Sequence, residues 1–299
     1  MQQINYSIVV VTYNREKLLR ECISRIEQQT IRADKVIIVN NASTDGTAAY
    51  LESLSGQSEA YRIINCRENV GGAGGFATGI KVAMDIGTEC LLIIDDDAML
   101  AADYMEKLLK AREQHRKYKA FAGSVIVDGK IDTYHRKMLS KKGFLMKNCK
   151  EDLYKQEYFE CDIASFCGML LDKEVIEKIG LPHADYFIWH DDTEYSLRIK
   201  KYSKFLVIPD AELIHKTKIN TTTYPRRYEW RDYYAVRNRI LFVREHGTFV
   251  DKIINYTDLF INVIFRNWLF GILKRDNYDW KYEKDTVRKA IKDTNNRKV

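Results

Sequence analysis

The first third of the chain alternates short apolar runs with segments whose apolar residues recur every three to four positions. The runs are rich in β-branched residues and end in polar turns, which is typical of buried strands. Helical spacing follows the first run, at Leu18, Leu19, Cys22, Ile23 and Ile26. We therefore predict an α/β fold with a mostly parallel sheet flanked by helices, with its first strands at 7–11, 36–39, 62–66 and 91–94.

The middle of the chain predicts shorter elements. Asp128-Gly129 lies between two strand-like runs, 121–127 and 130–134, and indicates a hairpin. The basic stretch 136–150 has scattered apolar residues without a period. We expect a mobile surface loop there, with a lid as the alternative. Further strands are expected within 161–171 and at 205–208.

The composition changes near Tyr228, where a more basic and aromatic region begins. One helix is predicted up to Gly247, and a second over 253–273. Asn262, Arg266 and Asn267 interrupt the second helix, so it makes a poor transmembrane span. It could instead lie in a membrane interface, pack on the first domain or meet a second copy of the chain. We predict two domains, 1–225 and 226–299.

Charge is distributed unevenly between these two regions. The 299 residues carry a net charge of +6. Residues 226–299 contain 17 Lys and Arg against 10 Asp and Glu, whereas residues 1–225 contain 31 against 32. The basic surplus predicts an anionic neighbour, either phospholipid or nucleic acid. Because the chain lacks an aromatic RNA-binding strand motif, we expect no nucleic-acid partner.

The six cysteines show none of the paired spacings typical of zinc-binding domains. Most of them lie among apolar residues, so we expect reduced core thiols and no structural zinc site. The chain starts without a positively charged segment followed by an apolar core, and no signal peptide is expected. These features predict a cytoplasmic protein at the inner face of the cell membrane.

The stretch Leu91–Leu100 is the strongest candidate for chemistry. Four apolar residues run directly into Asp95, Asp96 and Asp97. Strand alternation puts Asp95 and Asp97 on one side and Asp96 on the other. Two adjacent carboxylates repel unless a cation lies between them, and at the exit of a parallel strand a divalent metal holding a phosphate fits that role. The alternative is a solvated turn, or N-caps for a segment starting at Ala98.

Residues 72–77 match the dinucleotide pattern GxGxxA. That pattern belongs on the first strand–helix turn, whereas two such units precede it here, and an NAD enzyme would leave Asp96 and Asp97 without a role. We therefore interpret 69–77 as a glycine-rich turn whose backbone approaches a ligand and which opens a helix over 76–86.

A second polar cluster follows an aromatic run at residues 186–198. Asp191 or Asp192 could simply cap the helix that starts near Thr193. Aromatic side chains beside carboxylates also form platforms for sugar rings and raise carboxylate pKa values by desolvation. Downstream, His215 is either structural or a third ligand to a metal held by Asp95 and Asp97.

Five segments together resemble glycosyltransferase family 2. They are VVVTYNR, IIVNNASTDGT, NVGGAGGFATG, IDDDA and WHDDTEYSLR, in the family's order between residue 7 and about 215. The glycine-rich and aromatic-Asp-Asp segments are similar to the galactofuranosyltransferase and rhamnosyltransferase branch. The resemblance implies a GT-A fold, followed by a helical C-terminal extension without a recognisable motif.

The resemblance also implies roles for individual residues. Those along the nucleotide-sugar would be Thr12, Tyr13, Arg15, Asn41, Asn69, Gly72, Gly74, Asp95 and Asp96. Mn²⁺ or Mg²⁺ would be held by Asp95, Asp97 and His215. Asp192 would be the general base, Asp191 would orient the acceptor, and Trp189 and His190 would contact it. Many relatives have Asp where this chain has Asn41, which leaves the choice of base open.

These roles predict an inverting transferase with one base and no covalent nucleophile. We expect UDP-galactofuranose as donor and a glycan or lipid-linked acceptor in cell-surface polysaccharide synthesis. The alternative donors are dTDP-rhamnose and UDP-hexoses. An alternative of another class is a non-catalytic nucleotide- or membrane-binding module. The sequence leaves open whether the chain is a homo-oligomer.

Overall fold

The computed structural model describes residues 4–141, 144–217, 228–266, 268–269, 273 and 280–296. Its contacts divide the chain into two compact units. The first contains residues 1–138, 148–187 and 192–219, and the second contains 139–147, 188–191 and 220–299. The predicted domain boundary at 225 falls outside the described residues.

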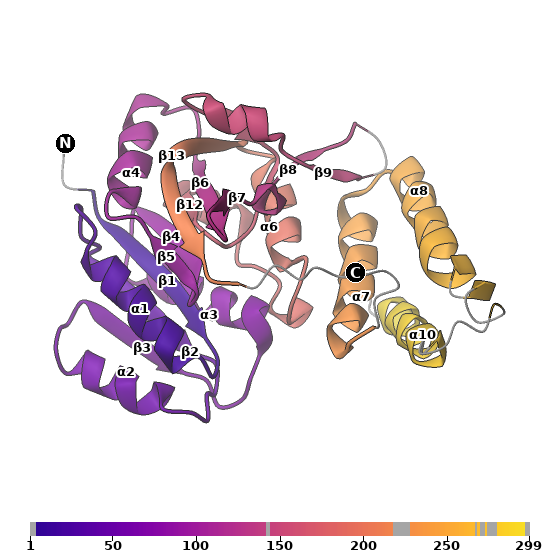
Figure 1. The fold of residues 1–299 in the computed structure, drawn as a ribbon, viewed down its shortest axis with the longest axis horizontal. Coiled ribbons are helices and arrows are strands. Elements are labelled where there is room, and N and C mark those ends of the chain that lie inside the picture. Colours follow the sequence, from indigo (N-terminus) through magenta and orange to yellow (C-terminus); the bar gives the residue numbers. More distant parts are fainter. Residues whose placement is uncertain are drawn as a thin grey trace. The chain divides into compact units, whose positions relative to one another are not determined.

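The first unit is built on a ten-stranded mixed sheet (Figure 1). Its strands are β1 (Tyr6–Thr12), β2 (Lys35–Asn40), β3 (Tyr61–Asn65), β4 (Cys90–Asp95), β5 (Ala98–Leu100), β6 (Ala120–Val127), β7 (Lys130–Ile131), β10 (Phe159–Cys161), β12 (Met169–Asp172) and β13 (Phe205–His215). The order is β10-β13-β6-β12-β4-β1-β2-β3, with β5 paired to β13 and β7 to β6. A three-stranded sheet has the order β11 (Ile163–Ala164), β8 (Arg136–Leu139), β9 (Met146–Asn148).

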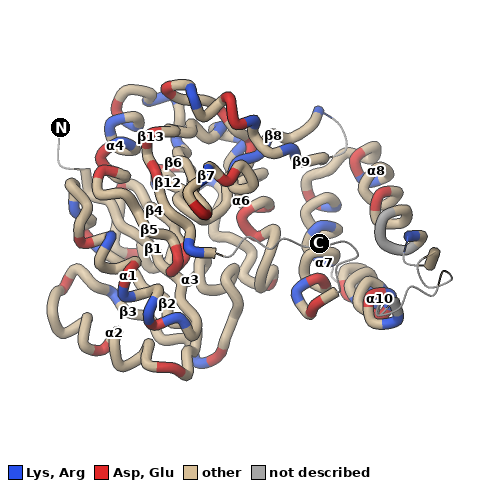
Figure 2. Tube along the Cα trace, viewed as in Figure 1, with Lys and Arg blue, Asp and Glu red and all other residues tan. Residues whose placement is uncertain are grey.

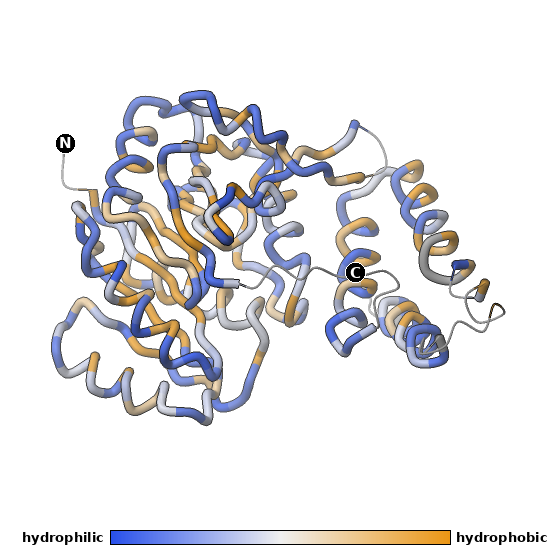
Figure 3. The backbone as a smooth tube through the Cα atoms, viewed as in Figure 1, coloured by the Kyte–Doolittle hydropathy of each residue, from blue (hydrophilic) through white to orange (hydrophobic). Residues whose placement is uncertain are grey.

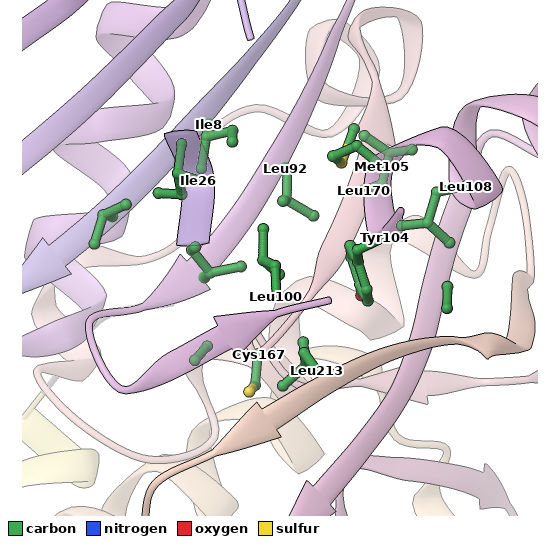
Figure 4. Packing of buried hydrophobic residues seen from close by; sticks show 14 of the residues in the cluster. Ile8, Ile26, Leu92, Leu100, Tyr104, Met105, Leu108, Cys167, Leu170 and Leu213 are labelled. Atoms are coloured by element: carbon green, nitrogen blue, oxygen red, sulfur yellow. The ribbon is translucent and has the colours of Figure 1, made fainter. Parts of the chain in front are cut away.

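Helices cover both faces of the large sheet because its strands are apolar on both sides. In β1, Ile8 and Val10 face one core, and Val9 and Val11 face the other. The first core is covered by α1 (Glu16–Glu27), α2 (Thr47–Ser55) and α4 (Tyr104–Gln114), and the second by α3 (Gly71–Asp85), α5 (Lys173–Ile179) and α6 (Asp191–Ile199). Figure 3 shows the central strands as the most hydrophobic part of this unit. Figure 4 shows the first core, where Tyr104 lies among Leu100, Leu108 and Leu170.

Strands β4, β1, β2 and β3 are parallel neighbours, as the alternating pattern predicts. The register pairs Val11 with Asp95 and Thr12 with Asn40. The carboxyl ends of β1, β2 and β4 therefore meet at one edge of the sheet, which is where α/β sheets bind ligands. The predicted hairpin is also confirmed, since β6 pairs antiparallel with β7 through Asp128 and Gly129, both with positive φ.

Two expectations for this unit were wrong. The glycine-rich segment is helical from Gly71 onward, so α3 begins five residues earlier than expected, and two of its glycines, Gly75 and Gly79, pack against β1. The stretch 136–150, expected to be a loop, contains the strands β8 and β9. A short 3₁₀ helix, Glu151–Lys155, follows this stretch. Arg136 in β8 is completely buried and donates hydrogen bonds to the carbonyl oxygens of Gly123, His135 and Cys167. A buried arginine satisfied by main-chain carbonyls cannot be recognised from sequence periodicity.

The close approach of α3 to β1 predicts a stability effect at Gly79. A Cβ there would lie 2.5 Å from Val9 Cγ1, inside a packed core, whereas a Cβ at Gly72 would be 4.0 Å from Phe76 Cε2. We expect Gly79→Ala to lower the free energy of unfolding by about 1–3 kcal/mol through overpacking. Gly72→Ala, in the same helix, is the matched control and gains helix propensity. Urea denaturation of both variants checks this, and equal midpoints would contradict it.

The second unit contains α7 (Trp230–His246), α8 (Phe249–Leu259), a π-helical turn (Phe260–Phe265) and α10 (Trp280–Asn296). The predicted helix ending at Gly247 is confirmed, the next begins four residues earlier than expected, and α10 was not predicted. Val236, Ile240, Leu259, Val287 and Ala290 form a small core among them. Acidic and basic residues both occur along α10 (Figure 2). Among the described residues, no helix is long and apolar enough to cross a membrane.

Candidate active site

The acidic triplet lies at the end of β4, where the strand stops at Asp95 and a two-residue turn leads into β5. The segment from Ala98 is thus a strand, not the helix-like segment expected. Beyond Asp95 the side chains are directed by this turn and not by strand alternation. Asp95 and Asp97 were expected on one side of the strand and Asp96 on the other. The structure agrees, because Asp95 and Asp97 both approach His215 whereas Asp96 is directed toward Thr12.

Asp97 and His215 are in direct contact within the site. His215 ends β13, which pairs with β5, and its Nε2 lies 3.0 Å from Asp97 Oδ1. Its Nδ1 is buried and has no hydrogen-bond partner. Burial alone would raise the pKa of Asp97. The hydrogen bond that His215 donates and the positive charge of its ring have the larger combined effect, so the pKa of Asp97 is lowered. The same contact raises the pKa of His215 against the opposing effect of burial.

Asp95 is held differently from Asp97. Burial and repulsion from Asp97 raise the pKa of Asp95 to about 7. The raised pKa means that the ionised form of Asp95 is unfavourable without a partner, and a cation beside it would stabilise that form. Donor atoms of Asp95, His215 and Cys167 all lie within 4.8 Å of one another. Two carboxylates and an imidazole therefore converge at the mouth of β4, and this set of oxygen and nitrogen donors fits a divalent cation.

Asp96 is the buried member that connects the triplet to the end of β1. Thr12 Oγ1 donates to Asp96 Oδ2 at 2.7 Å. The Arg15 guanidinium bridges Asp96 Oδ1 and Asp97 Oδ2, at 3.2 and 2.9 Å. Burial raises the pKa of Asp96 to about 6 in spite of these partners. Arg15 is half-exposed and so supplies a positive charge at the surface of the site. The neighbouring Tyr13 ring is 43% exposed, as a stacking surface must be.

Asn41 and Asn69 organise the turn that precedes α3. The Asn41 amide donates to Asn69 Oδ1 and to the carbonyl oxygen of Gly71, each at 2.9 Å, and its own oxygen accepts from the amide of Val70. Asn69 Oδ1 also accepts from the amide of Gly71. Both side chains therefore hold this turn at the end of β2. A contact from Asn41 to a base stays a prediction.

Asp192 lies near β8 of the same unit. Lys137 in β8 is close enough for its charge to oppose the rise in the pKa of Asp192 that burial causes. Two residues earlier, the His135 ring lies perpendicular to the His215 ring, with centroids 5.1 Å apart. One short segment therefore packs on His215 and also lies near Asp192. A carboxylate with a raised pKa can act as a general base, and that role for Asp192 stays a prediction.

Comparison with known proteins decides the family. The model of glycosyl transferase family 2 matches residues 7–180, more than half of the chain. The chain belongs to glycosyl transferase family 2. It is therefore a glycosyltransferase, and its mixed, mostly parallel sheet with flanking helices is the GT-A fold that the sequence resemblance predicts.

Relatives of this glycosyltransferase agree with the expected branch. It is 27% identical over 252 residues to the dTDP-rhamnosyl transferase RfbF of Shigella flexneri, with 81% of each chain covered. It is 29% identical over 212 residues to the galactofuranosyltransferase GlfT1 of Mycobacterium tuberculosis, covering 69% of this chain and 68% of that one. Among solved structures, the mannosyltransferase PcManGT of Pyrobaculum calidifontis in complex with GDP-Man and Mn²⁺ matches with a TM-score of 0.57 and 16% identity, covering 100% of this chain and 77% of that one.

The remaining predicted site residues of the glycosyltransferase lie in α3 and in the second unit. Gly74 faces Val70 within α3, whereas Gly72 has open space around its α-carbon. Trp189, His190 and Asp191 lie in the second unit. Trp189 and His190 have φ values of 63° and 65°, which few non-glycine residues adopt and which cluster at functional sites.

Three residues near these features were missed by sequence reasoning. Asn238 in α7 is fully buried and donates to the carbonyl oxygens of Ile188 and Trp189, at 3.0 and 2.7 Å, which holds the strained backbone. His135 packs on His215, and Cys167 lies next to Asp95. No pattern in the sequence connects these residues to the motifs, because each meets its partner only in the folded chain.

Proposed function

We propose that this glycosyltransferase moves galactofuranose from UDP-galactofuranose to a glycan or lipid-linked acceptor, with inversion and with a divalent cation. The observation that carries the proposal is the convergence of Asp95 and Asp97 on His215. The 29% identity to a galactofuranosyltransferase supports the donor. The 27% identity to a dTDP-rhamnosyl transferase supports dTDP-rhamnose as the second candidate.

Asp95, Asp97 and His215 would hold Mn²⁺ or Mg²⁺, and their donor set favours Mn²⁺. Bound there, the cation would neutralise charge on the leaving diphosphate. Thr12 orients Asp96, and Arg15 provides a further positive charge beside Asp96 and Asp97. Asp192 would accept the proton of the attacking acceptor hydroxyl, a role that its raised pKa suits. A single displacement by that hydroxyl inverts the anomeric centre.

A donor panel tests this proposal. The purified protein is incubated with Mn²⁺ and, separately, UDP-galactofuranose, dTDP-rhamnose and UDP-hexoses, and nucleoside diphosphate release is measured with and without EDTA. We expect release from UDP-galactofuranose that EDTA abolishes and Mn²⁺ restores. Turnover of dTDP-rhamnose alone would select the second candidate. Absence of metal-stimulated turnover with every donor would favour the non-catalytic module, and binding of NAD would revive the dinucleotide interpretation.

We further propose that the second unit contacts the membrane through α8 and the π-helical turn. Large apolar side chains are exposed along these elements, namely Phe249, Val250, Ile253, Phe260, Ile261 and Phe265. The surrounding region, residues 226–299, has a charge surplus of +7 from its 17 basic and 10 acidic residues. An exposed apolar helix face with basic surroundings fits an anionic lipid interface.

Vesicle binding checks the membrane contact. Phe260→Asp removes an apolar side chain that is 56% exposed and introduces a negative charge. We expect at least a tenfold loss of cosedimentation with anionic vesicles, because inserting one aromatic side chain contributes about 1.5–3 kcal/mol. Ile86→Asp, at an exposed apolar position of the first unit, is the matched control. Wild-type protein that remains in the supernatant would contradict the proposal.

A further inference from the structure

Cys167 is fixed directly beneath the carboxylate and imidazole cluster. It lies in the loop before β12, where Arg136 donates to its carbonyl oxygen at 3.0 Å and the following Gly168 donates to the carbonyl oxygen of Ile93. Gly168 has φ +82°, and a Cβ there would lie 2.3 Å from the Tyr104 hydroxyl, so the loop has little freedom. In Figure 4, Cys167 lies beside Leu213 of β13, the strand that ends in His215. Its side chain is 1% exposed.

The Cys167 thiol differs from the other core thiols in what surrounds it. Its Sγ, a carboxylate oxygen of Asp95 and a ring nitrogen of His215 lie within 4.8 Å of one another, and His215 is also 3.0 Å from Asp97. Cys22, the other buried thiol nearby, lies 3.8 Å from the main-chain oxygen of Asp95 and belongs to no such group of ligand atoms among the described residues. Cys167, His215 and Asp95 therefore offer one sulfur, one nitrogen and one carboxylate oxygen to a single cation, and Asp97 lies beside His215.

We propose that Cys167 is a third protein ligand, with Asp95 and His215, for a thiophilic cation, so that Zn²⁺ binds this site in competition with Mn²⁺ and the nucleotide-sugar. The inference rests on the proposed function, because it uses the same Asp95 and His215. It also changes the expectation from cysteine spacing that no zinc site exists, since the three residues are far apart in sequence.

Ligand preferences separate the two modes of binding. Thiolate and imidazole donors favour Zn²⁺ and Co²⁺ over Mn²⁺ and Mg²⁺, whereas carboxylate and phosphate oxygens suit Mn²⁺. Zn²⁺ is usually four-coordinate and tetrahedral, so three protein ligands would leave it at most one further position, too few for two oxygens of a diphosphate. Mn²⁺ takes more ligands and can keep positions for a diphosphate while Cys167 stays a packed thiol. Zn²⁺ would thus compete with both Mn²⁺ and the donor.

Cobalt provides a readout that is independent of activity, because a cobalt–thiolate bond gives a charge-transfer absorption in the near ultraviolet. We expect this absorption when the full-length protein is titrated with Co²⁺, and its loss when Zn²⁺ is added. Cys167→Ser should abolish it and weaken Zn²⁺ binding at least about tenfold, with Mn²⁺ binding unchanged within about twofold. Cys22→Ser, at the other nearby buried thiol, should retain both the absorption and Zn²⁺ affinity. Cys66→Ser, at the partly exposed thiol, should do the same.

The outcomes distinguish this inference from the proposed function. Co²⁺ binding to the wild-type protein without thiolate absorption would overturn the role of Cys167, and this measurement needs no variant to fold. Unchanged Zn²⁺ affinity in Cys167→Ser would overturn it as well. If Mn²⁺ promotes donor binding in the same preparation, the proposed function stands in either case. If Mn²⁺ neither binds nor promotes donor binding, the proposed function fails whatever the cobalt spectrum shows.

Discussion

Asp192→Asn is expected to lower the transfer rate by about 10²–10⁴-fold while donor binding in the presence of Mn²⁺ stays within about twofold of wild type. The amide keeps the shape of the carboxylate but cannot accept the proton of the acceptor hydroxyl. Burial already raises the pKa of Asp192 against the opposing charge of Lys137, which places the group closer to the range where a base works near neutral pH. Single-turnover rates with a saturating acceptor and calorimetry with the donor measure the two effects separately.

The control for this variant is Asp210→Asn, which changes an exposed aspartate of β13 in the same unit. It should leave both the rate and the donor affinity unchanged. Weakened donor binding with an intact transfer rate in Asp192→Asn would reject the assignment as base. Such a result would place Asp192 with the donor and leave the proton acceptor to another residue.

Asp97→Ala is expected to weaken Mn²⁺-dependent donor binding by at least about 100-fold, because residues that only support metal ligands already contribute 10–100-fold. The substitution removes a carboxylate that contacts both His215 and Arg15. His215 Nε2 would lose its partner at 3.0 Å, and Arg15 would keep only Asp96. Calorimetry with the nucleotide-sugar, with and without Mn²⁺, measures the change.

Asp210→Ala is the matched control and should bind the donor like the wild-type protein. Donor affinity in Asp97→Ala that matches the wild type in the presence of Mn²⁺ would remove Asp97 from the ligand set. A loss of affinity that is equal with and without Mn²⁺ would instead indicate that Asp97 acts on the donor through Arg15. The dependence on Mn²⁺ is therefore the informative part of the experiment.

Local patterns were sufficient for the elements whose two faces are both buried. Strands β1, β2 and β4 were predicted because Ile8 to Val11, Val36 to Val39 and Leu91 to Ile94 are continuous apolar runs, and a strand between two cores needs such a run. The helix α1 followed from its apolar spacing. The motif residues at the ends of these strands were predicted together with them, since the carboxyl ends of parallel strands meet at one edge.

Prediction failed where a residue's environment comes from distant segments. The glycines of 71–75 were assigned to a turn, yet they begin α3, where Gly75 packs closely on Val11 of β1 and Gly71 on Phe187, and this packing overrides the low helix propensity of glycine. Arg136 was assigned to a mobile surface loop because its neighbours are basic. It can be buried because three carbonyl oxygens satisfy it, one of the preceding residue His135 and two of the separate segments that contain Gly123 and Cys167.

The sequence by itself determined the α/β class, the positions of the first four strands, the family and the identity of the acidic triplet. These follow from periodicity and from motifs, which act over a few residues. Only the tertiary structure decided that Asp97 meets His215, that His135 packs on His215 while Lys137 of β8 lies near Asp192, and that Cys167 lies close to Asp95. Pairing of β13 with β5 and folding of β8 create these contacts between residues up to 118 positions apart, and no local pattern encodes such pairings.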